Sequence, residues 1–424
     1  MNRSRLTAIL MLAGVVMTGP GIAQPLADAQ RLLREGRPAE VLDPLAAAFA
    51  ADPESGEARA LVWGLARGAP PQPEFVDAFV AAADRLGPDG RIAAGVLLRR
   101  ALRPLDALEA FDRAVAGRPA GDPAADIEAG RLLAELRSHE RALARFRRHP
   151  RHPEAIHGQA VVLARMRQTA QAFALVDALL AADPGNPRAV LMRAELLDSV
   201  GRGSEALDAL RGLVEAAGPA SPAGSRLARI LVKLRAQEEA LPILEAILGA
   251  SPRDAEAWFA LGSAHDAAGR PGDAASAFRR ALAADAGQNE ARFRLARLLV
   301  REGDEEGGAE LFAEFERRQA MEDESGRLLG EAELDPSDSR RVDAFVSHAL
   351  SIGNWGLALH GSQRFLIEFP DDPARHLLLA RVFREGGRLG DAERVLRRGV
   401  ARFVGDADAV RRFEAGLRAI GASP

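Results

Sequence analysis

Small residues recur every 34 positions through the middle of the chain, and this period constrains the fold more than any other feature. Each of them lies within an apolar segment whose spacing is helical. They are Ala172, Ala206, Ala240, Ala274 and Gly308. A fixed repeat of this length indicates a helical solenoid, in which each unit packs only against its neighbours. The sequence therefore predicts an all-α chain, and not two or three separate globular domains.

The clearest copy of the repeat covers residues 255–288 and contains two helical patterns separated by a turn at 269–271. Apolar or small side chains recur there at three- and four-residue spacing, so each helix has one packing face. These faces carry Trp258, Leu261, Gly262 and His265, then Ala274, Phe278 and Ala281. The arrangement resembles the tetratricopeptide repeat, a 34-residue helix–turn–helix with a Trp, Leu-Gly, Tyr, Ala, Phe, Ala, Pro pattern. His265 stands in the tyrosine slot and Ala286 in the proline slot.

Other copies contain the features that this one lacks. A closing proline disfavours helix for the residue before it, and a glycine between the two helices allows a left-handed backbone. The prolines are Pro53, Pro119, Pro184, Pro252 and Pro370, and the glycines are Gly36, Gly201, Gly269, Gly303, Gly353 and Gly387. The resemblance implies an α-solenoid of about eleven tetratricopeptide-like helix–turn–helix repeats, followed by a C-terminal capping helix over residues 407–420.

The N-terminal segment, residues 1–23, has the pattern of a secretory signal peptide. Arg3 and Arg5 precede an apolar run over residues 6–17, and small residues lead to an expected cleavage after Ala23. The run is short for a membrane span, although an uncleaved membrane helix is the alternative. We therefore expect an exported, periplasmic bacterial protein with no transmembrane span in the mature chain.

Three further segments are expected after the signal. Residues 24–322 form an N-terminal repeat array, and residues 339–424 form a C-terminal repeat pair plus the capping helix. Between them the repeat slips by sixteen residues, at 323–338. From Glu302 to Asp335 there are thirteen carboxylates and three arginines, a balance typical of a solvated helix extension or a flexible linker. We expect residues 323–338 to be one or the other.

Composition excludes several kinds of chemistry. The chain has no cysteine, so it has no disulfide, no zinc-thiolate site and no thiol nucleophile. Its 56 basic and 60 acidic residues argue against nucleic acid as a partner. A histidine cluster at 149–157 lies among arginines that repel a cation, so we expect no metal there. No phosphate-binding loop or catalytic motif is found, and we expect neither an enzyme nor a cofactor.

The candidate binding surface is the first helix of each repeat, which lines a concave groove in the family that the chain resembles. The ninth and thirteenth positions share one helix face, and both are often basic. Two phenylalanines occupy the fifth position of adjacent repeats. The candidate partner-binding residues are Arg131, Arg165, Arg229, Lys233, Phe259, Phe293, Arg297 and Arg301. A solvated face in an arginine-rich protein is the alternative interpretation of the basic row.

These observations predict a non-enzymatic scaffold or adaptor of the bacterial cell envelope. It would bind an acidic segment of another envelope protein, with apolar anchors, in its concave groove. A carbohydrate-binding or polysaccharide-export accessory protein is the alternative. That function needs a row of exposed aromatic residues, and aromatic residues make up only 5% of the chain.

Overall fold

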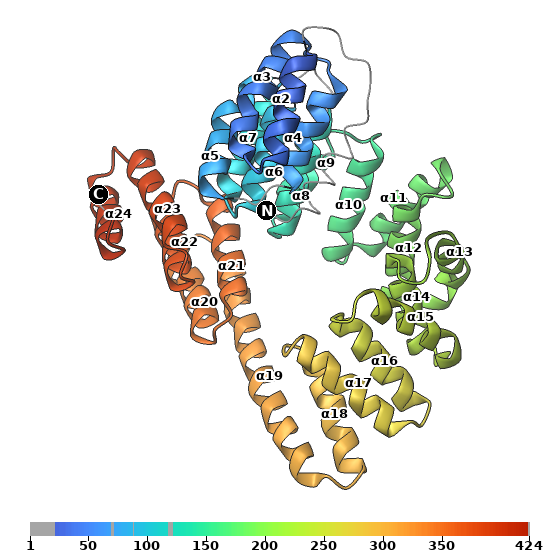
Figure 1. Cartoon of the computed structure of the whole chain (residues 1–424). Coiled ribbons are helices and arrows are strands. Elements are labelled where there is room, and N and C mark those ends of the chain that lie inside the picture. The colour runs from blue at the N-terminus through green and yellow to red at the C-terminus, as the bar shows by residue number, and fades with distance from the viewer. Residues whose placement is uncertain (1–21, 69–71, 88, 118–121, 423–424) are drawn as a thin grey trace. The chain divides into compact units, whose positions relative to one another are not determined.

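The computed structural model describes residues 22–68, 72–87, 89–117 and 122–422 (Figure 1). Within these ranges the chain consists of helices joined by turns, and they contain no strand. The prediction of an all-α solenoid is therefore confirmed. Residues 1–21 of the expected signal peptide lie outside the described residues.

The chain divides into two compact units, which are described separately. Unit 1 contains residues 1–162 and 354–424, and unit 2 contains residues 163–353. The N-terminal helices of unit 1 are α2 (Ala23–Arg34), η1 (Pro38–Val41), α3 (Leu42–Ala51), α4 (Gly56–Gly68), α5 (Pro73–Ala82), η2 (Ala83–Arg85), α6 (Gly90–Arg100), α7 (Pro104–Ala116), α8 (Ala124–Glu135) and α9 (His139–Phe146). Its C-terminal helices are α21 (Trp355–Glu368), α22 (Pro373–Glu385), α23 (Leu389–Arg402) and α24 (Ala407–Ala419).

Unit 2 is a continuous run of antiparallel helix pairs, and its boundary with unit 1 falls within α10 (Pro153–Arg165). Its helices are α11 (Thr169–Ala182), α12 (Pro187–Ser199), η3 (Gly203–Ala206), α13 (Leu207–Ala217), α14 (Pro222–Lys233), α15 (Gln237–Ala250), α16 (Ala255–Ala267), α17 (Pro271–Ala284), α18 (Asn289–Arg301), α19 (Glu305–Leu334) and α20 (Ser339–Ser351). Consecutive helices from α11 to α20 pack against one another, which is how a solenoid buries its core.

Polar side chains mark where the helices of unit 2 begin. The side chains of Asn186, Ser221, Asp254 and Asp304 each accept a hydrogen bond from the backbone N–H three residues later, at 2.9–3.3 Å. The first N–H groups of a helix have no partner within the helix, so such a cap stabilises its start. Asn186, Ser221 and Asp254 recur before the first helices of three successive repeats, α12, α14 and α16, whereas Asp304 caps α19, the second helix of its repeat.

The turn between paired helices has a left-handed residue, as the glycine positions predict. Gly201, Gly269 and Gly303 have φ of 78°, 74° and 92°. Where glycine is missing, another residue adopts the same conformation: Leu102, Arg137, Arg167 and Arg235 have φ of 58–61°. A side chain in this region costs about 1–2 kcal/mol. The turn geometry is therefore imposed by the helix pair even where the residue is unfavourable.

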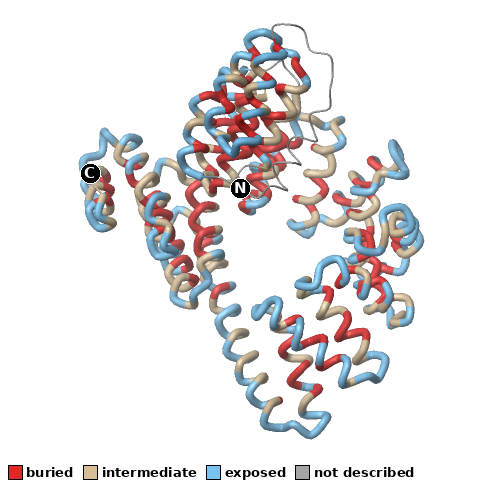
Figure 2. The backbone as a smooth tube through the Cα atoms, viewed as in Figure 1, coloured by how far each residue is buried: buried red, intermediate tan, exposed pale blue. Residues whose placement is uncertain are grey.

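Close contact between a glycine and a phenylalanine ring brings the paired helices together. A Cβ atom added to Gly262 on α16 would lie 2.6 Å from the ring of Phe278 on α17. Gly95 on α6 has the same relation to Phe111 on α7. Both phenylalanines are fully buried. Buried residues lie along the helix pairs (Figure 2), and in unit 2 one continuous cluster of them extends from Ala194 to Ala277.

Residues 323–334 continue α19 without a break, which gives this helix 30 residues. α19 packs against α18 and against α20. Residues 335–338 then form the turn before α20, where Asp338 caps the new helix by accepting from the N–H of Arg340 at 2.9 Å. The extra sixteen residues are thus accommodated mainly by lengthening one helix.

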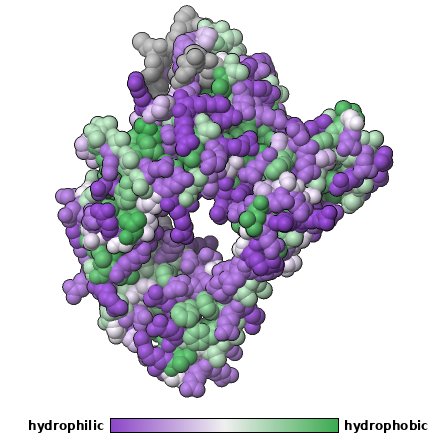
Figure 3. All heavy atoms as spheres, turned by 180° about the vertical axis from the view of Figure 1, so that it is seen from behind, coloured by the Kyte–Doolittle hydropathy of each residue, from purple (hydrophilic) through white to green (hydrophobic). Residues whose placement is uncertain are grey.

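On the face shown in Figure 3, hydrophilic residues predominate and apolar residues are scattered between them. Among the described helices, none is both long enough and apolar enough to cross a membrane.

Candidate functional site

A groove of about 1320 Å³ crosses the first helices of three successive repeats in unit 2, namely α14, α16 and α18. Five of the eight candidate residues line it: Arg229, Lys233, Phe259, Arg297 and Arg301. Basic side chains outnumber acidic ones, seven to four. The basic residues are Arg226, Arg229, Lys233, Arg235, Arg294, Arg297 and Arg301, and the acidic ones are Asp254, Glu256, Asp266 and Glu290. The excess of positive charge favours an anionic ligand.

Most of the basic side chains in the groove are already paired within the protein. Arg226 contacts Glu195 at 3.1 Å, Arg294 contacts Glu290 at 2.9 Å, and Arg301 contacts Asp266 at 3.0 Å. The ion pair between Arg301 on α18 and Asp266 on α16 joins the first helices of two successive repeats. The basic side chains of the groove are therefore partly neutralised, Arg226 and Arg301 by carboxylates of the preceding repeat and Arg294 by a carboxylate of its own helix.

Asp198 on α12 shows this neutralisation most fully. Its carboxylate is 10% exposed and accepts from Arg229 at 3.1 Å and from Lys233 at 2.8 Å. Burial alone would raise the pKa of Asp198, but hydrogen bonds from Lys233 and Arg229 outweigh it and hold the pKa below its ordinary value. Arg229 and Lys233 thus act first as links between repeats.

Arg297 and Ser263 lack such a partner, as does Arg235 at the end of α14 among the described residues. In the described chain, Arg297 on α18 has no carboxylate within ion-pair distance, and its guanidinium lies 6.0 Å from the ring centre of Phe293. Ser263 on α16 is 9% exposed, and its Oγ atom is buried without a hydrogen-bond partner. Buried hydroxyl groups are rarely left unsatisfied, so each exception calls for an explanation.

The two candidate phenylalanines have different environments. Phe259 is half-buried in the groove, with its ring centre 5.9 Å from that of Phe278 and the Arg294 guanidinium 5.8 Å away. Phe293 packs instead against Phe312 and Phe315 of α19, at 5.7 and 5.2 Å. It is not among the lining residues. Phe259 is therefore the aromatic residue that a ligand in the groove can contact.

The remaining two candidates are not among the residues that line this groove. Arg131 is on α8 of unit 1 and contacts Glu128 at 2.7 Å and Glu154 at 2.9 Å. Arg165 is exposed at the C-terminal end of α10. The structure thus brings together five of the eight predicted residues, and adds Ser263, Arg226 and Arg294 to them.

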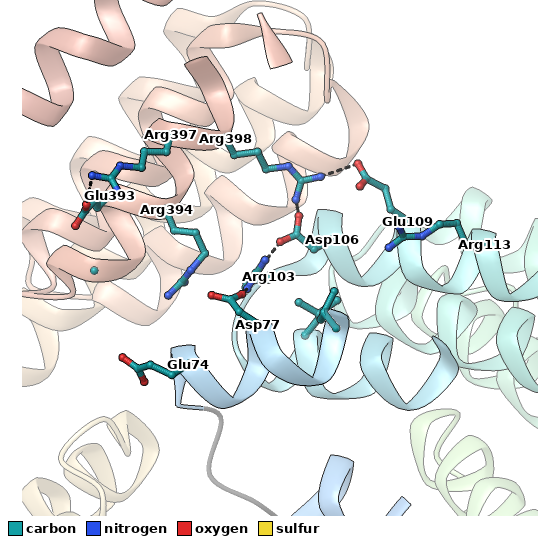
Figure 4. Close-up of a pocket in the computed structure, with 13 residues that line it drawn as sticks. Glu74, Asp77, Arg103, Asp106, Glu109, Arg113, Glu393, Arg394, Arg397 and Arg398 are labelled. Carbon is teal, nitrogen blue, oxygen red and sulfur yellow. Dashed lines mark hydrogen bonds and ion pairs between the residues drawn. The ribbon is translucent and has the colours of Figure 1, made fainter. Parts of the chain in front are cut away.

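A second pocket, of about 810 Å³, lies in unit 1 between α5, α7 and α23 (Figure 4). Arg103 contacts Asp77 at 2.5 Å and Asp106 at 2.6 Å, and Arg398 contacts Asp106 and, at 2.7 Å, Glu109. Burial, together with nearby arginines, lowers the pKa of Arg398 to about 10, and burial raises the pKa of Glu109. These charges pair with one another, so the pocket is an ion-pair network that holds α23 against α7.

One member of the histidine cluster, His149, has a structural role within unit 1. His149 Nε2 lies 3.0 Å from Asp126 Oδ2, while Asp126 Oδ1 accepts from Arg145 and Arg148 at 3.1 and 2.9 Å. Asp126 is buried, so these contacts compensate for the removal of its charge from water. In the part of the chain that the structure describes, no group of histidine, aspartate and glutamate residues is arranged to hold a metal ion.

Comparison with known proteins identifies the repeats. Two models described as tetratricopeptide repeat match the sequence, one over residues 225–289, 264–324 and 344–409 and the other over 163–231. No curated protein matches the chain.

The solved structures that resemble this one are distant in sequence. The human IFIT1 dimer with PPP-AAAA matches over 95% of this chain and 100% of its own, with 15% identity and a TM-score of 0.43. A tetratricopeptide repeat protein from Parabacteroides merdae ATCC 43184 matches over 66% of this chain and 100% of its own, with 17% identity and a TM-score of 0.42. MamA matches over 39% of this chain and 96% of its own, with 16% identity and a TM-score of 0.35. These similarities concern the helical repeat architecture alone.

Proposed function

The chain belongs to the tetratricopeptide repeat family, and on that basis we propose that it is a non-enzymatic scaffold or adaptor of the bacterial cell envelope. Repeats of this family form protein-interaction surfaces, and a stack of them presents an extended concave face to a partner. The partner is a segment of another envelope protein, and it binds in the groove across α14, α16 and α18.

The observation that carries this proposal is the composition of the groove. It combines an excess of basic side chains with one partly exposed aromatic residue, Phe259. An acidic segment with an apolar anchor complements both features. Exposed ion pairs are each worth only about 0–1 kcal/mol, so the basic residues set orientation and association rate. The apolar anchor on Phe259 supplies more of the affinity.

The same lining argues against the carbohydrate-binding alternative. Sugar rings stack on exposed aromatic faces, and the groove offers only Phe259. Trp258, next in sequence, donates from Nε1 to the carbonyl of Pro252 at 2.9 Å and has the Arg280 guanidinium 4.7 Å from its ring. Its ring is therefore engaged within its own repeat.

Partner capture tests the proposal. The full chain with a C-terminal affinity tag is expressed in its source organism, cross-linked and purified, in parallel with Phe259→Ala and Arg297→Glu. We expect an envelope protein with an acidic segment to co-purify with the wild type and to be depleted with both variants. Arg279→Glu, on the exposed face of α17, is the matched control. Equal capture by all four proteins would show that the groove is not the binding site.

The envelope location rests on the N-terminal sequence pattern and needs its own test. Cell fractionation, followed by N-terminal sequencing of the mature chain, should find the protein in the periplasm beginning at Gln24. A chain that retains Met1 in the cytoplasm would contradict the location without affecting the groove.

A further inference from the structure

We infer that the α16–α18 end of the groove contains a subsite for a carboxylate side chain with an apolar neighbour, formed by Ser263, Arg297 and Phe259. The inference rests on the proposed function and names the chemistry that the partner must present. Its ligand is an aspartate or glutamate side chain within the bound segment, next to a residue such as leucine, isoleucine, methionine or phenylalanine.

Ser263 provides the first argument, because its hydroxyl is buried in the groove wall without a partner. A serine on a helix can bond the carbonyl of the preceding turn, and this one does not. Leaving the hydroxyl unsatisfied costs free energy in the unbound protein. If Ser263 turns about its Cα–Cβ bond so that Oγ points into the groove, a ligand carboxylate oxygen accepts from it and removes that cost on binding.

The positions of the basic residues provide the second argument. Arg229, Ser263 and Arg297 occupy the ninth position of three successive repeats, so they follow one another along the groove. Arg229 is paired with Asp198 at 3.1 Å, whereas Arg297 has no carboxylate partner in the described chain. A ligand carboxylate gains more from an unpaired guanidinium, because no internal ion pair has to be broken.

Phe259 and its small neighbours provide the third argument. Phe259 lies one helical turn before Ser263 on α16, and so on the same face. Ala260 and Ala267 also line the groove there, and their short side chains leave space beside the ring. An apolar ligand side chain fits against Phe259 while the adjacent carboxylate reaches Ser263 and Arg297. The three residues therefore recognise a pair of ligand groups.

Selection from a random peptide library tests the subsite directly. Twelve-residue peptides displayed on phage are selected on the full-length wild-type protein, and enriched peptides are synthesised with amidated and with free C-termini. Affinity is then measured by fluorescence anisotropy. We expect enriched peptides to share an acidic residue within two positions of an apolar one. The amidated form should bind as well as the free acid, which identifies a side-chain carboxylate.

The variants separate a ligand-binding role from a structural one. Ser263→Ala and Arg297→Gln should each weaken peptide binding about tenfold, the effect of losing one hydrogen bond to a charged group. Ser276→Ala and Arg279→Gln, both exposed on α17, are the matched controls and should bind as the wild type does. Ser263→Ala should keep or raise the melting temperature, because it removes an unsatisfied buried hydroxyl.

Two results would overturn the inference. In the first, Phe259→Ala or Arg229→Gln weakens binding of the enriched peptides, but Ser263→Ala and Arg297→Gln leave it unchanged. This result excludes the subsite and leaves the proposed function intact. The absence of any enriched peptide that depends on a groove residue excludes both the subsite and the proposed groove.

Discussion

Lys233 on α14 donates hydrogen bonds to both carboxylate oxygens of Asp198 on α12, at 2.8 and 2.9 Å. Arg229, one turn before Lys233, donates to the same carboxylate at 3.1 Å. Two residues that the sequence suggests as ligand contacts therefore join two successive repeats. Asp266 and Arg301 repeat this arrangement two repeats further along, at 3.0 Å.

Asp198→Asn should destabilise the protein in a pH-dependent way. The pKa of the Asp198 carboxyl is lower in the folded than in the unfolded protein. Its ion pairs therefore stabilise the fold at a pH above the unfolded-state pKa of about 4, and this stabilisation is lost as the pH falls through the folded-state pKa. We expect the variant to lose about 1 kcal/mol of unfolding free energy at pH 7 and almost nothing in strong acid. Urea unfolding at both pH values measures this. Asp208→Asn, whose side chain is 98% exposed, is the control, and an equal loss at both pH values would contradict the assignment.

Ala240→Phe and Ala274→Phe should each lower the unfolding free energy by about 1–3 kcal/mol. Both alanines are fully buried between paired helices, and the helices cannot separate without disturbing the next repeat. Thermal and chemical unfolding measure the loss. Ala216→Phe, at an exposed position of α13, should have little effect. Unchanged stability in both core variants would show that the helix contact is misplaced.

Arg167→Gly should stabilise the protein by about 0.5–1 kcal/mol. Arg167 has φ of 59° in an exposed turn. Glycine there removes the backbone strain that a side chain causes, and the greater conformational entropy of glycine in the unfolded chain offsets part of this gain. Arg167→Ala keeps the strain and should give no gain. The reverse change, Gly269→Ala, where φ is 74°, should destabilise by about 1 kcal/mol. A gain in stability from Gly269→Ala would exclude the left-handed turn.

Glycine-to-alanine substitutions should have opposite effects at two kinds of position. Gly326 and Gly330 lie within α19, and a Cβ atom at either would meet no neighbour within 4 Å. Alanine there should stabilise by about 0.5–1 kcal/mol per site, because glycine is a poor helix former. Gly262→Ala should instead destabilise, since the Phe278 ring lies 2.6 Å from the added atom. Differential scanning calorimetry of the three variants would show whether the signs differ.

The repeat architecture could be predicted because its signals are local and recur. Ala240 and Ala274 fall at equal spacing and are both fully buried, and the glycine positions coincide with left-handed turns. The left-handed conformation of Leu102 has no such signal, because the packing of α6 on α7 imposes it on an unfavourable residue. The contact between Arg398 and Asp106 could not be predicted from the sequence either, because the repeat period does not relate residues so far apart in the chain.

The candidate site was predicted only in part, for the same physical reason. The groove contains Arg229, Arg297 and Phe259 as expected, because their slots recur on one helix face. Which arginine is unpaired depends on the residue that faces it from the preceding repeat. An acidic residue about one repeat before a basic one, such as Asp198 thirty-five residues before Lys233, is a sequence signal that could have shown which basic residues of the groove are paired. Phe293 is covered by Phe312 and Phe315 of α19.

The length of α19 has a mechanical consequence for unit 2. A helix of 30 residues extends for about 45 Å, and residues 323–334 contribute about 18 Å of it. Both α18 and α20 pack against this one helix. A tilt of one end of α19 therefore also displaces its other end. Residues 323–334 therefore act as a stiff spacer, and residues 335–338 form the turn that leads from it into α20.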